Sequence, residues 1–125
     1  MHLTVAIATS GRREITSRLV TRLARQTRLP DVVVICPASV DDADANVGAG
    51  LPLPVRIVHG SRGLPAQRNT ILRASSETDL IVYFDDDFIP AETYLEACEQ
   101  VFRDHDDVAI LTGSVIADGI KTSGI

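Results

Sequence analysis

The sequence predicts an α/β fold in which a mostly parallel sheet is flanked by helices, in the manner of a Rossmann-like domain. Short apolar runs alternate along the chain with longer segments whose apolar residues recur at helical spacing. Several of these runs are continuously apolar, which is typical of parallel strands buried on both faces. Of the 125 residues, 45% are hydrophobic and only 4% aromatic, so Val, Ile, Leu and Ala must build the core.

The first half of the chain contains two predicted strands, one helix and a long loop. Residues 3–8 (LTVAIA) form a strand, and residues 13–27 have the apolar periodicity of a helix that Pro30 ends. Residues 31–36 (DVVVIC) form the second strand. Residues 37–54 are rich in Pro, Gly and Asp, which predicts a mobile loop with little apolar area to bury.

The second half continues the alternation. Residues 55–60 (VRIVHG) are a third strand, and a second helix begins near Pro65. Residues 80–84 (LIVYF) are a fourth strand, Pro90 opens a third helix, and residues 108–113 (VAILTG) are a fifth strand. The helical faces expected to pack on the sheet carry Ile15, Leu19, Val20, Leu23 and Ala24, then Ile71, Leu72 and Ala74, then Tyr94, Leu95, Cys98, Val101 and Phe102.

Composition excludes some functions. A net charge of −5 and the scarcity of aromatic rings argue against nucleic acid as a partner. Cys36 and Cys98 lie in apolar contexts and are predicted to be buried free thiols in a reducing, cytoplasmic compartment. No signal peptide or membrane span is expected. The histidines His2, His59 and His105 lack the spacing of a metal site and are interpreted as structural.

Three adjacent carboxylates, Asp85 to Asp87, follow the fourth strand and need a positive partner. In an open α/β sheet, ligands bind beyond the carboxyl ends of the strands, where Thr9 also leaves the first strand. Asp85 and Asp87, with the middle Asp86 pointing elsewhere, would form an Asp-x-Asp pair suited to Mg²⁺ or Mn²⁺. The alternative is a solvated acidic turn that caps a helix.

Residues 63–96 (GLPAQRNTILRASSETDLIVYFDDDFIPAETYLE) resemble the central block of family 2 inverting glycosyltransferases, which have the GT-A fold. The shared order is Gly, Ala, Arg-Asn, a helix, an apolar strand, Asp-x-Asp, proline and a Tyr-Leu helix. Residues 3–13 (LTVAIATSGRR) resemble the first strand and turn of that family. The resemblance implies that residues 1–125 are the donor-binding part of a metal-dependent glycosyltransferase that works in polysaccharide biosynthesis, without the acceptor part.

The resemblance also implies roles for individual residues at a nucleotide-sugar site. Thr9 and its neighbouring backbone would hold the nucleobase, and Arg68 and Asn69 would lie on the base and ribose side. Arg12 would assist the phosphates, although a solvated arginine at a helix start is an open alternative. The donor would be a UDP- or GDP-linked sugar.

For the carboxylates, the resemblance implies that Asp87 ligates Mn²⁺ or Mg²⁺, which bridges the two phosphates. Asp85 would approach the ribose, or the metal through water, and Asp86 is counted among the donor-binding residues. The general base that inversion requires is expected beyond Ile125, so the chain alone is expected to be inactive in transfer.

One departure from the family concerns the segment after the second strand. The family usually has Asp-Asp-Gly-Ser there, with an Asp that recognises uracil, whereas this chain has CPASVDD with Asp41 and Asp42 further out. Either aspartate could read the base, or the loop reads it differently.

The sequence leaves other functions open. A non-catalytic nucleotide-sugar-binding remnant fits the same residues, and an aspartate-nucleophile phosphatase fits them less well, because Ile89 stands where its motif requires Thr or Val. A receiver-type domain would carry its acid pair after the first strand. Peripheral association with the inner face of the membrane through the acceptor, and a homo-oligomer, are compatible with the glycosyltransferase reading.

Overall fold

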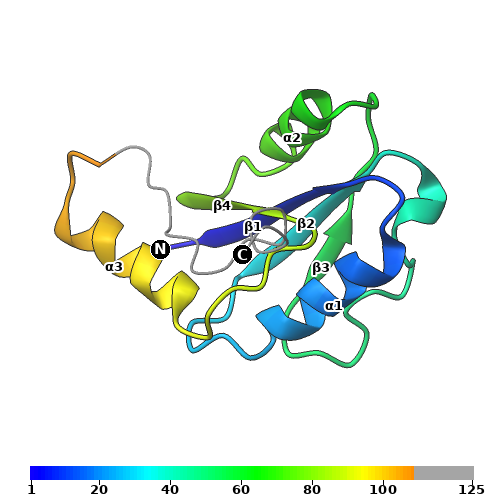
Figure 1. Ribbon diagram of the computed structural model, residues 1–125. Coiled ribbons are helices and arrows are strands. Elements are labelled where there is room, and N and C mark those ends of the chain that lie inside the picture. Colours follow the sequence, from blue (N-terminus) through cyan, green and yellow to red (C-terminus); the bar gives the residue numbers. More distant parts are fainter. Residues whose placement is uncertain (109–125) are drawn as a thin grey trace, which may run out of the picture.

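The computed structural model describes residues 1–108, and their central element is a parallel sheet of four strands in the order β3-β2-β1-β4 (Figure 1). The strands are β1 (Leu3–Thr9), β2 (Val32–Pro37), β3 (Val55–Ile57) and β4 (Leu80–Asp85). All three neighbouring pairs run parallel, and Ala8 of β1 is in register with Cys36 of β2 and with Asp85 of β4. The predicted α/β class and parallel sheet are therefore confirmed. The predicted strand over residues 108–113 lies outside the described residues except for Val108.

The helices cover both faces of the sheet. α1 (Arg13–Leu23) and α3 (Tyr94–Asp104) lie on one face, α2 (Leu64–Arg73) lies on the other, and a short 3₁₀ helix, η1, spans Val40–Asp42 (Figure 1). Over residues 1–108, every helix is too short or too polar to cross a bilayer.

Each face of the sheet has its own core. Leu3, Val5 and Ile7 of β1 pack with the α1 and α3 side, whereas Ala6 packs with the α2 side, as the alternation of side chains along a strand requires. The core residues on the larger side are Leu3, Val5, Ile7, Leu19, Val20, Leu23, Val33, Ile35, Ala43, Leu53, Leu80, Val82, Phe84 and Leu95. Those on the α2 side are Ala6, Val32, Val34, Cys36 and Ile71.

The predicted helical faces are right for most residues and wrong for two. Ile71 of α2 is fully buried, but Leu72 is 52% exposed, and Ile15 of α1 is 37% exposed. Successive helical residues point about 100° apart, so Leu72, next to the buried Ile71, and Ile15, next to the buried Thr16, turn away from the sheet. Cys36 and Cys98 are free and buried, which confirms the prediction for the thiols. Burial raises the pKa of both thiols.

The segment between β2 and β3 corrects one expectation. Instead of burying little apolar area, residues 37–54 place Ala43 and Leu53 in the core, each 6% exposed, and pack Val47 and Leu51 against it. Ser39 and Asp42 form a reciprocal capping box around η1. The few apolar residues of this loop are spaced so that they reach the α1 face of the sheet.

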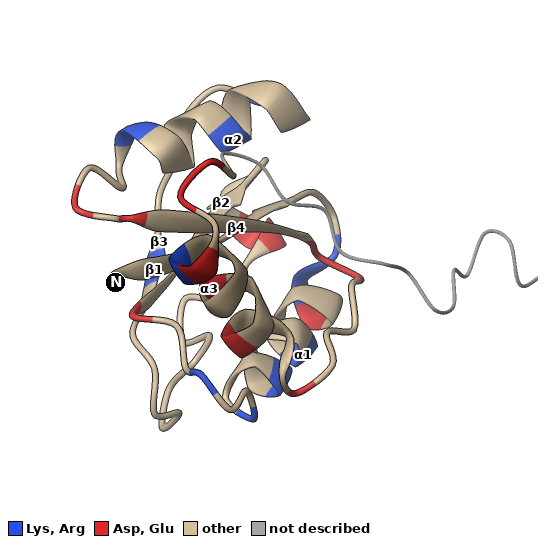
Figure 2. Cartoon of the chain, turned by 90° about the vertical axis from the view of Figure 1, so that its left-hand side faces the viewer, with Lys and Arg blue, Asp and Glu red and all other residues tan. Residues whose placement is uncertain are grey.

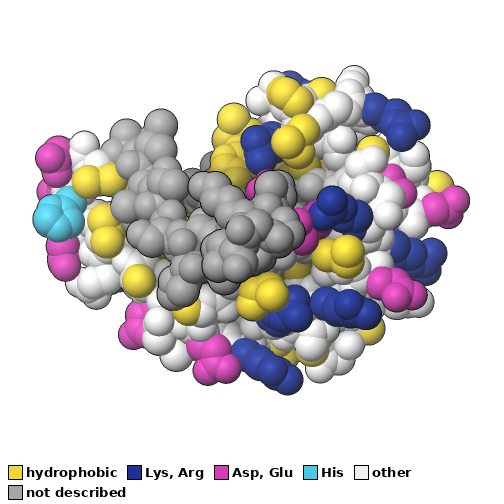
Figure 3. All heavy atoms as spheres, viewed as in Figure 1, with side chains coloured by type: hydrophobic (Ala, Val, Ile, Leu, Met, Phe, Trp, Pro, Cys, Tyr) yellow, Lys and Arg dark blue, Asp and Glu magenta, His cyan; other side chains and the backbone are white. Residues whose placement is uncertain are grey.

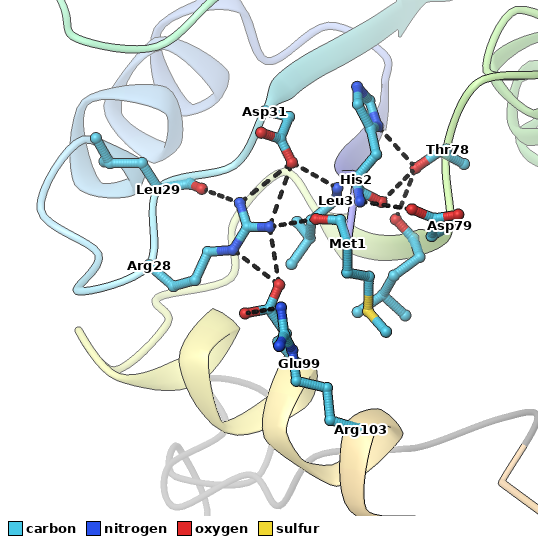
Figure 4. A network of polar contacts seen from close by, with 11 residues as sticks. Met1, His2, Leu3, Arg28, Leu29, Asp31, Thr78, Asp79, Glu99 and Arg103 are labelled. Carbon is cyan, nitrogen blue, oxygen red and sulfur yellow. Dashed lines mark hydrogen bonds and ion pairs between the residues drawn. The ribbon is translucent and has the colours of Figure 1, made fainter. Parts of the chain in front are cut away.

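A polar network ties α3 to the amino end of the sheet (Figure 4). Arg28 Nη2 donates to Glu99 Oε2 at 2.8 Å and to the Met1 carbonyl at 2.6 Å, and Arg28 Nη1 lies 3.2 Å from Asp31 Oδ2. The same Asp31 oxygen accepts the Leu3 N–H at 2.7 Å. The network therefore lies at the opposite end of the sheet from the carboxyl edge.

Candidate functional site

A cavity of about 520 Å³ opens at the carboxyl edge of the sheet. It lies there because β1 ends at Thr9, β2 at Pro37 and β4 at Asp85, and strands that run parallel end at the same edge. Its lining residues are Ala8, Thr9, Ser10, Arg12, Ala38, Arg62, Gly63, Leu64, Gln67, Asp85, Asp86 and Asp87. The predicted gathering of Thr9 with the acidic triplet at one edge is confirmed.

The middle carboxylate is anchored to β1. Thr16 Oγ1 donates to Thr9 Oγ1 at 2.9 Å, and Thr9 Oγ1 donates in turn to Asp86 Oδ2 at 2.8 Å. The Asp86 side chain is only 12% exposed. The expectation that Asp86 points away from the crevice is wrong, because the buried Thr9 hydroxyl draws its carboxylate inward.

Arg12 supplies the positive charge that the acidic triplet needs. Its Nη1 lies 3.3 Å from Asp86 Oδ1 and 3.1 Å from Asp87 Oδ2. The hydrogen bond to Asp87, together with the negative charges of both carboxylates, raises the pKa of the Arg12 guanidinium. In the cartoon of Figure 2, the red loop after β4 lies near the blue segment that precedes α1, and these are the two segments that the ion pairs join.

The third carboxylate points to a different arginine. Asp85 is 72% exposed, and its Oδ1 lies 3.4 Å from Arg68 Nη2. Arg68 also lies over the ring of Tyr83, 5.9 Å from its centroid. Arg68 and Asn69 are absent from the cavity lining, and Asn69 is exposed. Of the predicted site residues, the structure therefore brings Thr9, Arg12 and the three aspartates together and leaves Arg68 and Asn69 at the margin.

Gln67 and Arg62 are among the lining residues that sequence reasoning missed. Gln67 is 3% exposed, although glutamine is seldom buried. A signal was present, since Gln67 lies four residues before Ile71 and therefore on the buried stripe of α2. Arg62 is exposed at the cavity rim, in the loop before α2, and had no local pattern to mark it.

The two aspartates considered for base recognition lie outside the cavity lining. Asp42 Oδ2 accepts the Ser39 N–H at 3.1 Å in the capping box, so this carboxylate is committed to η1. Asp41 is exposed on η1. Ala38, which does line the cavity, is the residue of this segment that faces it.

The chemistry of the carboxylates fits a hard divalent cation in part. Asp87 is 60% exposed at the cavity, and its oxygens are ligands that Mg²⁺ and Mn²⁺ accept. Within residues 1–108, no three His, Cys, Asp or Glu side chains are arranged to hold a metal. Mg²⁺ is usually held by one or two carboxylates together with water and substrate phosphates, so the residues fit an ion that arrives with a phosphate ligand.

A second group of basic residues lies on the outer face of α1. Arg18, Arg22 and Arg25 border a shallow hollow of about 340 Å³ with Ser17 and Thr21, and dark blue side chains gather over α1 in Figure 3. These arginines point away from the sheet, as the periodicity of residues 13–27 predicts.

Comparison with known proteins gives a family match and a set of similar folds. The family model described as "Glycosyl transferase family 2" matches residues 4–123. The search of curated proteins gave no significant match.

Among solved structures, the chain is similar to S. aureus TarS 1-349, with a TM-score of 0.65 at 19% identity over 94% of this chain and 39% of that one. For TarS 1-349 in complex with UDP-GlcNAc, the TM-score is 0.66 at 14% identity, over 94% and 37% of the two chains. For the complex with UDP, the TM-score is 0.59 at 17% identity, over 94% and 38%. The chain thus spans less than two fifths of these structures, and at such identities the likeness concerns the fold.

Proposed function

Since this chain belongs to glycosyl transferase family 2 and has the GT-A fold, we propose that its cavity binds the nucleoside-diphosphate part of a sugar donor. The observation that carries the proposal is that Arg12, Arg62 and the acidic triplet line one cavity. Guanidinium groups suit the phosphates of such a donor, and carboxylates suit the cation that accompanies them. Because the chain belongs to this family, the alternative hypotheses of a phosphatase and of a receiver-type domain are rejected.

The reaction proposed is transfer of the sugar to an acceptor hydroxyl with inversion. Arg12 and Arg62 would orient the phosphates, and the Thr9 turn and the backbone at Ala38 would hold the nucleobase. Because TarS 1-349 is described in complex with UDP-GlcNAc and with UDP, a UDP-linked donor is favoured over a GDP-linked one.

Asp87 would ligate Mn²⁺ or Mg²⁺, because its carboxylate is the more exposed of the two that Arg12 contacts. When bound, the ion would neutralise charge that develops on the leaving nucleoside diphosphate. Asp86 would keep the acidic loop in place through Thr9, and Asp85 would approach the ribose side next to Arg68.

Calorimetric titration with UDP and with GDP tests the proposal, first with Mn²⁺ and then with a chelator. We expect UDP to bind, Mn²⁺ to tighten binding, and Asp87→Ala to remove most of the metal-dependent part. Asp107→Ala removes an equal charge from an exposed position outside the cavity lining and serves as the control, as does His59→Ala. Equal affinity with and without metal would refute the role of Asp87, and the absence of any nucleotide binding would refute the proposed function.

A further inference from the structure

Gln67, in the first turns of α2, is bonded to three separate segments of the chain. Its Nε2 donates to the Thr9 carbonyl at 3.0 Å and to the Cys36 carbonyl at 2.8 Å. Its Oε1 accepts the Gly63 N–H at 3.2 Å. Both amide hydrogens and the amide oxygen are therefore used, and the side chain is 3% exposed.

All three partners lie in segments that border the cavity. Thr9 ends β1 and lines the cavity, and Gly63 lines it from the loop before α2. Cys36 lies next to the end of β2, two residues before the lining residue Ala38. A single side chain thus joins three of the segments that enclose the cavity.

The fourth segment, the acidic loop after β4, is reached through Thr9. The Thr9 carbonyl accepts from Gln67, while the Thr9 hydroxyl donates to Asp86. These bonds connect the start of α2 to Asp86 through the Thr9 residue. A shift of Gln67 would therefore be passed on to Asp86.

Packing alone does not explain a glutamine at this position. The next buried residue on the same stripe of α2 is Ile71, which shows that an apolar side chain satisfies the core there. A buried amide is costly unless it is hydrogen-bonded, and here the three bonds offset that cost. Gly63 has a φ of +111°, a conformation that favours glycine, and the Gln67 oxygen holds its N–H in that orientation.

We infer that Gln67 is a positioning residue for the donor site: its amide holds the start of α2 against the ends of β1 and β2, which are already paired with each other, and so sets the width of the nucleotide cavity on its α2 side. The inference rests on the proposed function. Gln67 holds the backbone segments that surround the nucleotide, including the turn at Thr9. Through Thr9 it also holds the acidic loop.

A matched control exists in Gln26, the other buried glutamine of residues 1–108, which is 5% exposed. Gln26 Nε2 donates to the Ala91 carbonyl at 2.7 Å, and its Oε1 accepts the Leu95 N–H at 3.0 Å. It therefore joins the end of α1 to the start of α3 by the same chemistry but is absent from the cavity lining. Replacement of either glutamine by Met keeps the length of the side chain and removes the bonds.

Thermal unfolding and UDP titration of Gln67→Met and Gln26→Met separate positioning from simple stability. Both variants should unfold at a lower temperature, but only Gln67→Met should bind UDP more weakly, by about tenfold. Gln26→Met should bind within about twofold of the unmodified chain. Equal affinities for the two variants would overturn the inference.

Amide hydrogen exchange gives a readout that needs no nucleotide. In Gln67→Met, exchange should rise together in residues 9–12, 37–42 and 60–63, and in Gln26→Met it should rise in residues 91–97 instead. If the unmodified chain binds no nucleotide, the proposed function fails, and this comparison alone decides whether Gln67 holds the segments together. Unchanged exchange in the three segments of Gln67→Met would overturn the inference in either case.

Discussion

The hydroxyl of Thr9 lies 2.8 Å from Asp86 Oδ2, although 77 residues separate the two in the chain. The contact joins the end of β1 to the loop that follows β4. It places one carboxylate of the triplet against the sheet and leaves Asp87 at the opening of the cavity, 60% exposed. The difference between these neighbouring aspartates is therefore set by one threonine.

Replacement of Thr9 by Val should lower the free energy of unfolding by about 1–3 kcal/mol, because the Thr16 hydroxyl loses its acceptor and Asp86 loses a donor. Thr4 is the control on the same strand. It is fully buried, and within residues 1–108 its hydroxyl has no hydrogen-bond partner. Thr4→Val should therefore raise the free energy of unfolding. Denaturant unfolding measures this free energy for both variants, and a similar decrease in the two would contradict the prediction.

Arg12→Gln should tighten the binding of Mn²⁺ in the absence of nucleotide, because a cation that competes for Asp86 and Asp87 is removed. Titration of Mn²⁺ followed by electron paramagnetic resonance measures this affinity. Arg18→Gln, which removes an exposed arginine from the outer face of α1, is the control and should leave it unchanged. Identical Mn²⁺ affinities in all three proteins would argue that Arg12 does not compete with the ion.

The pH dependence of stability should report on Glu99. The hydrogen bond from Arg28 lowers the pKa of Glu99 below its ordinary value of 4.5, so the folded state favours the carboxylate. The stabilisation is present above pH 4.5 and is lost as the pH falls through the lowered pKa of the folded state. Glu99→Gln should therefore cost about 1.5–3 kcal/mol near neutral pH and much less in acid.

Denaturant unfolding of the Glu99→Gln variant at several pH values tests this expectation. Glu14→Gln removes an exposed carboxyl from the first turn of α1 and serves as a control for the change in net charge. A loss of stability in Glu99→Gln that is independent of pH would show that the pair with Arg28 contributes through packing and not through charge.

The segment between β2 and β3 should behave as part of the core. Leu53 is 6% exposed and packs in the main hydrophobic cluster, so Leu53→Ala should lower the free energy of unfolding by about 2–5 kcal/mol. Val40, in the same segment, is 72% exposed, and Val40→Ala should change it by less than about 0.5 kcal/mol. Equal effects of the two substitutions would support the sequence-based expectation of a loosely packed loop.

The class of fold and the edge of the sheet at which the site lies follow from patterns in the amino-acid sequence. Apolar runs such as residues 80–84 and the periodicity of residues 13–27 are local signals, and local signals suffice to place strands and helices. Parallel strands all end at the same edge of a sheet, so Thr9 and the acidic triplet were expected at one edge. That they touch depends on β4 lying next to β1.

Which side chains bond to one another at that edge depends on how the elements pack. Asp86 bonds to Thr9 and Arg12, which are far away in the chain. Two of the three partners of Gln67, the carbonyls of Thr9 and Cys36, are also far away in the chain. Such bonds depend on the exact rotation of α2 and on the register of β1 with its neighbours. One step of 100° along a helix separates the buried Ile71 from the exposed Leu72, and no pattern read along the chain resolves that step for a short helix. The elements are therefore determined by residues near one another in sequence, whereas the site is determined by hydrogen bonds and burial that exist only once the elements have packed.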